Sequence, residues 1–169
     1  MIWFTSDQHF YHKKMLEYRN FNTIEEMNNF LIKKYNQVVK DKDIVYFLGD
    51  FSFGTVPQTI EILKQLKGHK HLILGNHDRK KIYKKNIFKQ YFESITDYYE
   101  LKYNHQLYIL CHYPFETWHK KHYGSIHLYG HIHFNNINFI KNRYHVGVDT
   151  NNFTPVCIDS FSFSILEDL

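Results

Sequence analysis

The sequence predicts an α/β fold in which two β-sheets pack together. Between residues 2 and 91, short apolar strands alternate with segments whose apolar residues recur at helical spacing. Between residues 98 and 166, short strand candidates follow one another with only turn-forming residues between them. Alternation followed by clustered strands is typical of α/β layers built on two packed sheets.

Length and composition favour one domain that spans residues 1–169. A chain of 169 residues can bury a sizeable core, and no linker, internal repeat or low-complexity tract divides it. Hydrophobic residues make up 43% of the chain and charged residues 22%, which is typical of a globular protein rather than a disordered one.

Targeting signals and cysteine usage indicate the compartment. We find no signal peptide before the first strand and no apolar run as long as a transmembrane helix. The two cysteines, Cys111 and Cys157, fall inside predicted strands and form neither a zinc-finger pattern nor a disulfide framework. We therefore expect a cytoplasmic protein with no membrane partner.

The elements of the first half follow from apolar periodicity and capping residues. Thr23 and Glu26 have the spacing of a capping box at the start of the clearest helix. Pro57 suits the first turn of the next helix, and Gly68 is its expected C-cap. The predicted strands are residues 2–5, 44–48 and 71–74, and the predicted helices are residues 13–19, 23–38, 55–66 and 80–91.

The second half is read as strands because short β-branched and aromatic runs are separated by turn-forming pairs. Examples of such pairs are Asn104-His105 and Asn151-Asn152. The predicted strands are residues 98–103, 107–111, 126–129, 144–148, 156–158 and 161–166.

Residues 72–78, Leu-Ile-Leu-Gly-Asn-His-Asp, carry the first indication of a functional site. We expect Gly75 to adopt a positive φ and to permit a sharp exit from a buried strand. Asn76, His77 and Asp78 then follow without a spacer, so three polar side chains leave one strand end. In open α/β sheets, ligands bind beyond the carboxyl ends of the strands.

Polar side chains follow five predicted strands in the same way. The groups are Asp7 and His9; Asp50; Asn76, His77 and Asp78; His112; and His131 and His133. In an extended segment, residues two apart point to the same side, so Asp7 and His9 could bind one ion together, as could His131 and His133. Burying so many ionisable groups without a cation would be very costly.

The donor types indicate which cations fit. The set consists of oxygen and imidazole ligands without thiolate, which favours Mn, Fe, Zn or Ni over Ca or Mg. At least seven candidate ligands exceed what one tetrahedral zinc needs, so two ions sharing a carboxylate fit better. Two ions about 3.5–4 Å apart can clamp the attacking and leaving oxygens of a phosphoryl displacement.

The five groups resemble the signature blocks of the calcineurin-like metallophosphoesterase superfamily in order and approximate spacing. The matching segments are Asp7-Gln8-His9, Gly49-Asp50, Gly75-Asn76-His77-Asp78, His112 and Gly130-His131-Ile132-His133. The residues around them are similar to a small single-domain group in bacteria and bacteriophages. The resemblance implies a β-sandwich of two mixed sheets flanked by helices, and two divalent transition-metal ions, with Mn²⁺ expected first.

The resemblance also implies roles for individual residues. The first metal would be bound by Asp7, His9, Asp50 and His133, and the second by Asp50, Asn76, His112 and His131. Metal-bound hydroxide would attack phosphorus. His77 would protonate the leaving oxygen or stabilise its charge, and Asp78 would orient His77.

The substrate is expected to be a phosphate ester. Asp50 is followed by Phe51-Ser52-Phe53-Gly54 and not by the Asp-Arg pair of the protein phosphatases. This departure favours a phosphodiesterase acting on a nucleotide or another small diester. A phosphomonoesterase or a nuclease with the same two-metal site stays open, and a non-catalytic scaffold is the less favoured alternative because every ligand is present.

The candidates for substrate binding are Asn76, within a signature block, and His12 and Arg79, which lie next to signature blocks. A solvated surface role is equally open for His12 and Arg79. Asp149 follows a predicted strand, and we interpret it first as a structural turn residue. The net charge of +4 is spread over lysine pairs, which we interpret as solvated helix faces. Nucleic acid is a permitted partner but is not indicated, because the chain has no basic stripe interleaved with aromatic residues.

Overall fold

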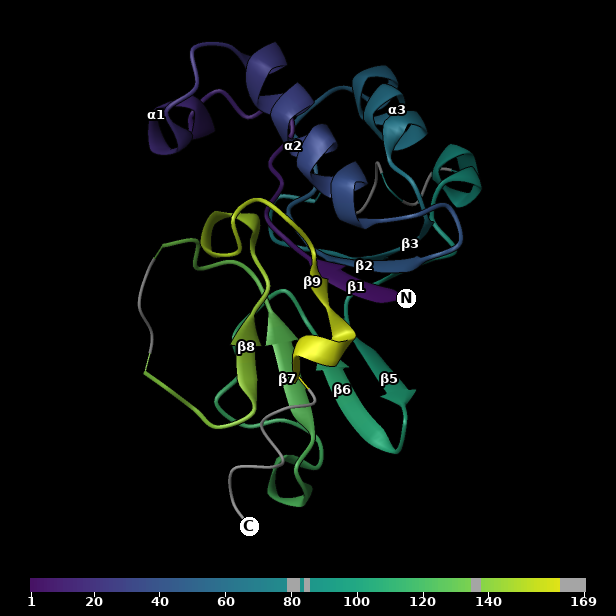
Figure 1. Cartoon of the computed structure of the whole chain (residues 1–169), viewed down its shortest axis with the longest axis vertical. Helices are drawn as coiled ribbons and strands as arrows, with labels where there is room; N and C mark the ends of the chain where they lie inside the picture. The colour runs from purple at the N-terminus through teal and green to yellow at the C-terminus, as the bar shows by residue number, and fades with distance from the viewer. Residues whose placement is uncertain (79–82, 84–85, 135–137, 162–169) are drawn as a thin grey trace.

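The computed structural model describes residues 1–78, 83, 86–134 and 138–161. Two mixed sheets lie one above the other, with the helices on the outer face of the larger sheet (Figure 1). The larger sheet has the order β4-β3-β2-β1-β9, with β1 (Ile2–Thr5), β2 (Ile44–Leu48), β3 (His69–Ile73), β4 (Ser94–Thr96) and β9 (Val156–Cys157). The smaller has the order β5-β6-β7-β8, with β5 (Tyr99–Tyr103), β6 (Gln106–Leu110), β7 (Ile126–Tyr129) and β8 (Arg143–His145). The predicted fold class is confirmed.

Strand directions make both sheets mixed. In the larger sheet β1 to β4 run parallel, and β9 joins β1 antiparallel. In the smaller sheet β6, β7 and β8 run parallel, and β5 forms an antiparallel hairpin with β6. Each sheet therefore gathers the carboxyl ends of three or more strands at one edge.

Helices α1 (Met15–Arg19), α2 (Ile24–Val38) and α3 (Val56–Gln65) lie on the same side of the larger sheet. The Thr23 hydroxyl accepts a hydrogen bond from the Glu26 amide, as the capping-box spacing predicts. Thr55 and Gln58 form a complete capping box at α3. Four short 3₁₀ helices complete the described elements: η1 (Asn86–Gln90), η2 (Lys121–Tyr123), η3 (Val148–Thr150) and η4 (Ile158–Phe161).

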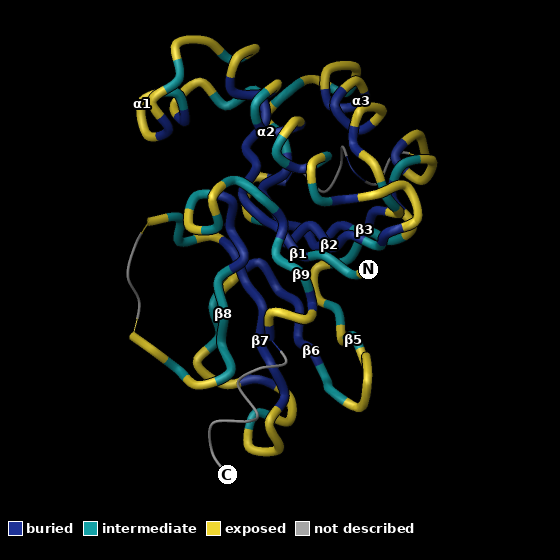
Figure 2. The backbone as a smooth tube through the Cα atoms, viewed as in Figure 1, coloured by how far each residue is buried: buried dark blue, intermediate teal, exposed yellow. Residues whose placement is uncertain are grey.

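The larger sheet is buried on both faces. On one face Phe47 and Leu72 pack against apolar residues of α2 and α3, and on the other Tyr46 packs against Leu110 and Leu128 of the smaller sheet. This explains why β2 is a continuous apolar run rather than an alternating one. Figure 2 shows the resulting burial of β1, β2 and β3, in contrast to the more exposed β5 and β8.

Several element boundaries differ from the prediction. The helix α3 has its C-cap at Leu66, and Gly68, with a φ of +82°, lies in the turn that follows. The predicted strand 144–148 ends at His145, because Val148 begins a 3₁₀ helix. Strand β4 was not predicted, since its three residues are too few to show periodicity. Most of the predicted helix 80–91 and of the predicted strand 161–166 lies outside the described residues, and Phe161 ends η4.

Among the described residues, no helix combines the length and apolar character needed to cross a membrane.

The buried carboxylate of Asp43 ties the first strand to the turn before β2. Its Oδ1 lies 2.9 Å from the Met1 ammonium, and its Oδ2 accepts hydrogen bonds from the Trp3 indole at 3.0 Å and the Lys40 amide at 2.9 Å. The ammonium, followed by the other donors, lowers the pKa of Asp43. A lowered carboxyl pKa stabilises the fold above the unfolded-state pKa of about 4, and the effect is lost as the pH falls through the folded-state pKa.

We therefore expect Asp43→Asn to lower the melting temperature at pH 6 to 7, and the difference from wild type to shrink as the pH falls below about 4. Thermal denaturation across about pH 2.5 to 7 measures this difference. Asp41→Asn, an exposed change in the same turn, is the matched control. A difference that stays constant over the whole range would contradict the electrostatic explanation.

Candidate metal centre

Five strand ends meet at one edge of the two sheets. Strands β1, β2 and β3 are in parallel register, with Thr5 opposite Phe47 and Phe47 opposite Leu72, so the loops that follow them lie side by side. Strands β6 and β7 are likewise parallel. The structure brings these predicted ligands together: Asp7, His9, Asp50, Asn76, His112, His131 and His133.

The backbone reason for this convergence differs from the predicted one. The residues Asp7, His9, Asp50, His131 and His133 have φ values of 60°, 50°, 54°, 75° and 48°. These are left-handed conformations, so the expectation that Asp7 with His9, and His131 with His133, point to one side of an extended segment was wrong. Non-glycine residues in this region cost about 1–3 kcal/mol each and cluster at functional sites.

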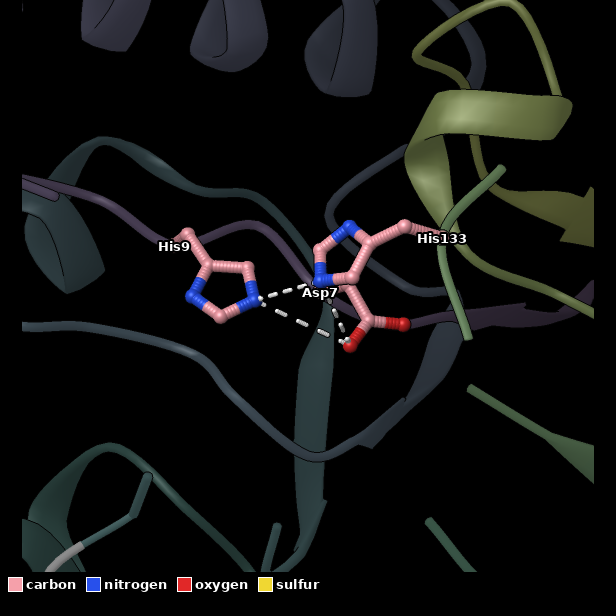
Figure 3. A group of neighbouring side chains, drawn as sticks. All are labelled: Asp7, His9 and His133. Carbon is pink, nitrogen blue, oxygen red and sulfur yellow. Dashed lines mark hydrogen bonds and ion pairs between the residues drawn. The ribbon is translucent and has the colours of Figure 1, made fainter. Parts of the chain in front are cut away.

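One group of donor atoms surrounds His9 and His133. Their Nε2 atoms face each other at 3.1 Å, and each lies 3.9 Å from Asp7 Oδ1 (Figure 3). Asp50 Oδ2 lies 3.7 Å from His9 Nε2. The Asp7 carboxylate and the two imidazole nitrogens therefore lie within 4.8 Å of one another, and Asp50 adjoins them at His9.

A second group shares Asp50 with the first. Asn76 Oδ1 lies 2.9 Å from His112 Nε2 and 3.0 Å from His131 Nδ1. His112 Nε2 lies 3.5 Å from Asp50 Oδ2, the same oxygen that approaches His9. Asp50 Oδ2 thus lies beside both sets of donors, and Asp7 also reaches the second set, because ligand atoms of Asp7, Asp50 and His112 lie within 4.8 Å of one another.

The electrostatics of the cluster suit a cation. Burial lowers the pKa of His9 to about 2, which leaves a neutral imidazole with a free lone pair. Burial raises the pKa of Asp7, whereas at Asp50 the neighbouring His112 outweighs burial and the pKa is lowered. The facing Nε2 atoms of His9 and His133 can share one proton at most, so a divalent ion satisfies this donor set better than hydrogen bonds do.

Glycines allow the loops to approach the cluster closely. A Cβ on Gly75 would lie 2.3 Å from Asp50 Oδ1 and 2.6 Å from the Asp50 amide nitrogen. The predicted positive φ at Gly75 was wrong. The glycine with a positive φ here is Gly49, at +90°, in the neighbouring loop before Asp50. Gly75 is required for close approach and not for its backbone conformation.

The Asp78 carboxylate joins the two loops that carry Asp50 and Asn76. It accepts hydrogen bonds from the amides of Asp50 at 2.7 Å, Phe51 at 3.0 Å and Gly75 at 2.9 Å. Burial raises the pKa of Asp78 to about 6, against these hydrogen bonds. The predicted orientation of the His77 ring by Asp78 is a separate role, and it stays a prediction.

His77 and His12 lie on the open side of the cluster. The His77 amide donates to Asp50 Oδ1 at 2.9 Å, while its side chain is exposed and its ring centroid lies 5.8 Å from that of His9. The His12 ring stacks on Phe53 with centroids 3.7 Å apart and planes 5° apart. Arg79, the other predicted substrate contact, lies outside the described residues.

A buried arginine that the sequence did not reveal holds the first group in place. The side chains of Arg19 and Asp149 are fully buried and form an ion pair at 2.7 Å. The Arg19 guanidinium also donates to the carbonyl oxygens of Asp7 at 2.6 Å and Gln8 at 2.7 Å. Asp149 Oδ2 lies 2.6 Å from His133 Nδ1, so Asp149 positions a candidate ligand and is more than a turn residue.

One signal in the sequence could have pointed to Arg19. The chain strongly prefers lysine, and Arg19 is one of only three arginines. A planar, always charged fork suits buried pairing with a carboxylate and with carbonyls, which a lysine cannot replace.

His145 is another neighbour that the sequence did not single out. Its Nε2 is buried without a hydrogen-bond partner and lies 3.9 Å from Asp7 Oδ2, and burial lowers its pKa to about 4. The Ser6 hydroxyl donates to the same Asp7 oxygen at 2.6 Å. No sequence motif marked His145, because only the three-dimensional fold places β8 beside Asp7.

The two mixed sheets and the aspartate and histidine cluster at their strand ends are the features of a phosphoesterase fold. The family model of the calcineurin-like phosphoesterases matches residues 1–150, and the chain belongs to this family. The resemblance expected from the signature blocks is confirmed.

Individual relatives come from archaea, bacteriophages and bacteria. Uncharacterized protein MJ1445 of Methanocaldococcus jannaschii is 36% identical over 168 residues, which cover 94% of this chain and 87% of that protein. The gene 66 protein of Mycobacterium phage L5 is 30% identical over 177 residues, with 87% and 86% covered. The crystal structure of AQ665 from Aquifex aeolicus, a protein of unknown function, superposes with a TM-score of 0.76 at 25% identity over 96% of this chain and 97% of that chain.

The buried pair of Arg19 and Asp149 gives a stability prediction. Arg19→Met and Asp149→Ala should each lower the free energy of unfolding by roughly 3–5 kcal/mol, because each leaves a buried charge without its partner. The double variant should lose clearly less than the sum of the two. Urea denaturation of the four proteins of this double-mutant cycle measures the coupling.

The exposed pair of Lys64 and Glu61, at 2.7 Å, is the matched control, and its own cycle should show no comparable coupling. Simple additivity at Arg19 and Asp149 would show that the two side chains do not stabilise one another.

Proposed function

We propose that this chain is a metal-dependent phosphodiesterase that hydrolyses a nucleotide or another small diester with two divalent transition-metal ions. The observation that carries the proposal is the position of Asp50 Oδ2, 3.7 Å from His9 Nε2 in one donor group and 3.5 Å from His112 Nε2 in the other. Membership of the calcineurin-like phosphoesterase family supports the same reaction class.

The residues present fit two ions of the kind that accept oxygen and nitrogen ligands. Asp7, His9, Asp50 and His133 would hold the first, and Asp50, Asn76, His112 and His131 the second; Mn²⁺ is our first candidate, with Fe, Zn and Ni as alternatives. When bound, such a pair supplies positive charge for phosphate oxygens and activates a water molecule for attack.

The protein's own side chains would orient the metal ligands and protonate the leaving oxygen. Asp149 holds the His133 ring through Nδ1, so Nε2, which faces His9, is the ring nitrogen available to a metal ion. Asp78 fixes the loop of Asp50, and the Asp50 carboxylate in turn accepts the His77 amide. The exposed His77 ring is then free to give a proton to the leaving oxygen.

A diester is favoured over a monoester by the residues after Asp50. Phe51 is fully buried in the core, and Phe53 stacks with His12, so the 51–54 segment offers no cation to a dianionic phosphate. The complete donor set argues against a non-catalytic scaffold. A phosphomonoesterase or nuclease remains the alternative that the substrate comparison below tests.

The metal content provides the direct test. Elemental analysis of purified protein should find close to two transition-metal ions per chain, because the candidate ligands form two donor groups and phosphoryl transfer of this kind uses a pair of ions. Asp50→Asn should disturb both sites, and His9→Ala mainly one.

Hydrolysis of bis(p-nitrophenyl) phosphate should exceed that of p-nitrophenyl phosphate in kcat/KM, and chelation should abolish both. Full hydrolysis by metal-free protein, or a clear monoester preference, would overturn the proposal.

The role of His77 can be separated from metal binding. General acid catalysis contributes about 10²–10⁴-fold, and it matters most for a poor leaving group such as a ribose hydroxyl. His77→Ala should therefore retain its metals, lose most activity on a dinucleotide, and lose much less on a p-nitrophenyl ester. Metal analysis and the two rate constants measure this, with His122→Ala, an exposed histidine on η2, as the control.

Equal losses on both substrates with the metals intact would rule out the acid role and leave His77 as a stabiliser of transition-state charge.

A further inference from the structure

Two hollows adjoin the donor cluster through different residues. The first, of about 200 Å³, includes Asn76 and His77 in its lining, together with the hydroxyls of Ser52 and Thr59. The second, of about 400 Å³, is lined by His133 and three other residues described next. A diester bound at the cluster has two substituents, and the two hollows offer one place for each.

The second hollow is aromatic and open to solvent. Beside His133 it is lined by Met15, Tyr18 and Phe134. Tyr18 is 70% exposed and Phe134 is 53% exposed, so two large aromatic side chains are accessible to solvent beside the candidate metal centre. Met15 and Tyr18 are three residues apart on α1 and therefore share one face of that helix.

The helix that carries Tyr18 is fixed relative to the cluster. Arg19, the next residue, is buried and donates to the carbonyl oxygens of Asp7 and Gln8. On the other side, Phe134 directly follows the ligand candidate His133. Both rings are thus tied to the place where the phosphate would bind, which is the condition for a subsite that orients a substrate.

We propose that Tyr18 and Phe134 form a stacking subsite for the nucleobase of the substituent that stays on the phosphate, with the leaving alcohol on the His77 side. This inference rests on the proposed phosphodiesterase function. The oxygen of a water molecule bonds to phosphorus and the water gives up one proton to solvent; the bond from phosphorus to the leaving oxygen breaks, His77 gives that oxygen a proton, and a nucleoside monophosphate remains.

A planar ring fits the second hollow better than a long acyl chain does. The lining includes two rings that are more than half exposed, Tyr18 and Phe134, and base–aromatic stacking is tolerant of sequence because every base has a π-face. The first hollow is also lined by Phe53 and Tyr83, but it adds the hydroxyls of Ser52 and Thr59 and the amide of Asn76, which suit a polar alcohol such as a sugar. The substrate class is therefore a nucleotide diester bound in one orientation.

The test compares three p-nitrophenyl diesters that share a leaving group and differ in the retained substituent: thymidine 5′-yl, methyl and hexyl. Wild-type protein with Mn²⁺ should prefer the thymidine ester by about tenfold or more in kcat/KM, the size expected for one stacked base. Tyr18→Ala and Phe134→Ala should erase most of this preference through KM, whereas Tyr18→Phe should keep it. Tyr123→Ala, which removes an 88% exposed ring outside the hollow, is the control.

Binding gives a second readout that does not depend on turnover. Calorimetric titration with thymidine 5′-monophosphate should show weaker binding to Tyr18→Ala, by roughly the same factor, and unchanged binding to Tyr123→Ala.

The outcomes separate the two proposals. If the methyl or hexyl ester is hydrolysed as well as the thymidine ester, the stacking subsite is wrong while the phosphodiesterase proposal stands. If no diester is hydrolysed, the proposed function fails, and the titration alone decides whether Tyr18 and Phe134 bind a base.

Discussion

The buried carboxylate of Asp50 is the group on which both halves of the candidate metal centre depend. One of its oxygens approaches His9 and His112, and the other accepts the backbone amide of His77. Its own amide is held by Asp78, and the absence of a Cβ at Gly75 leaves room for its side chain. A charged group this deeply buried is costly unless a cation or a full set of donors compensates it, so the surrounding loops are constrained to supply donors.

The architecture explains where that constraint can be met. The larger sheet is buried on both faces, so polar ligands can emerge only where its parallel strands end, and the smaller sheet brings His112 and His131 to the same edge. This is why the clustering of these aspartates and histidines could be predicted from the sequence: an apolar strand that stops at an aspartate or histidine is visible without any coordinates. The sandwich of two sheets was predictable for the same reason, from strand runs that alternate with helices and later cluster.

What the sequence could not show depends on contacts between distant segments. The left-handed backbone at Asp7 and His133 could not be read from the sequence, because neither residue stands in a pattern typical of a turn. Arg19 and Asp149 are 130 positions apart, and no local pattern joins them. His145 reaches Asp7 only because the register of β8 places it there.

Arg19 also links the candidate metal centre to the proposed base subsite. The helix α1 has five residues and no side-chain N-cap, and a helix this short is not stable by itself. Its position is set by the guanidinium of Arg19, which reaches the backbone of Asp7 and Gln8 and, through Asp149, the ring of His133. The same buried charge therefore orients His133, a candidate metal ligand, on one side and the helix that carries the exposed Tyr18 on the other. Because one guanidinium contacts both, a change that loosens it should move the donor atoms and Tyr18 together, and under the proposed function we expect metal affinity and affinity for the retained nucleoside to change together.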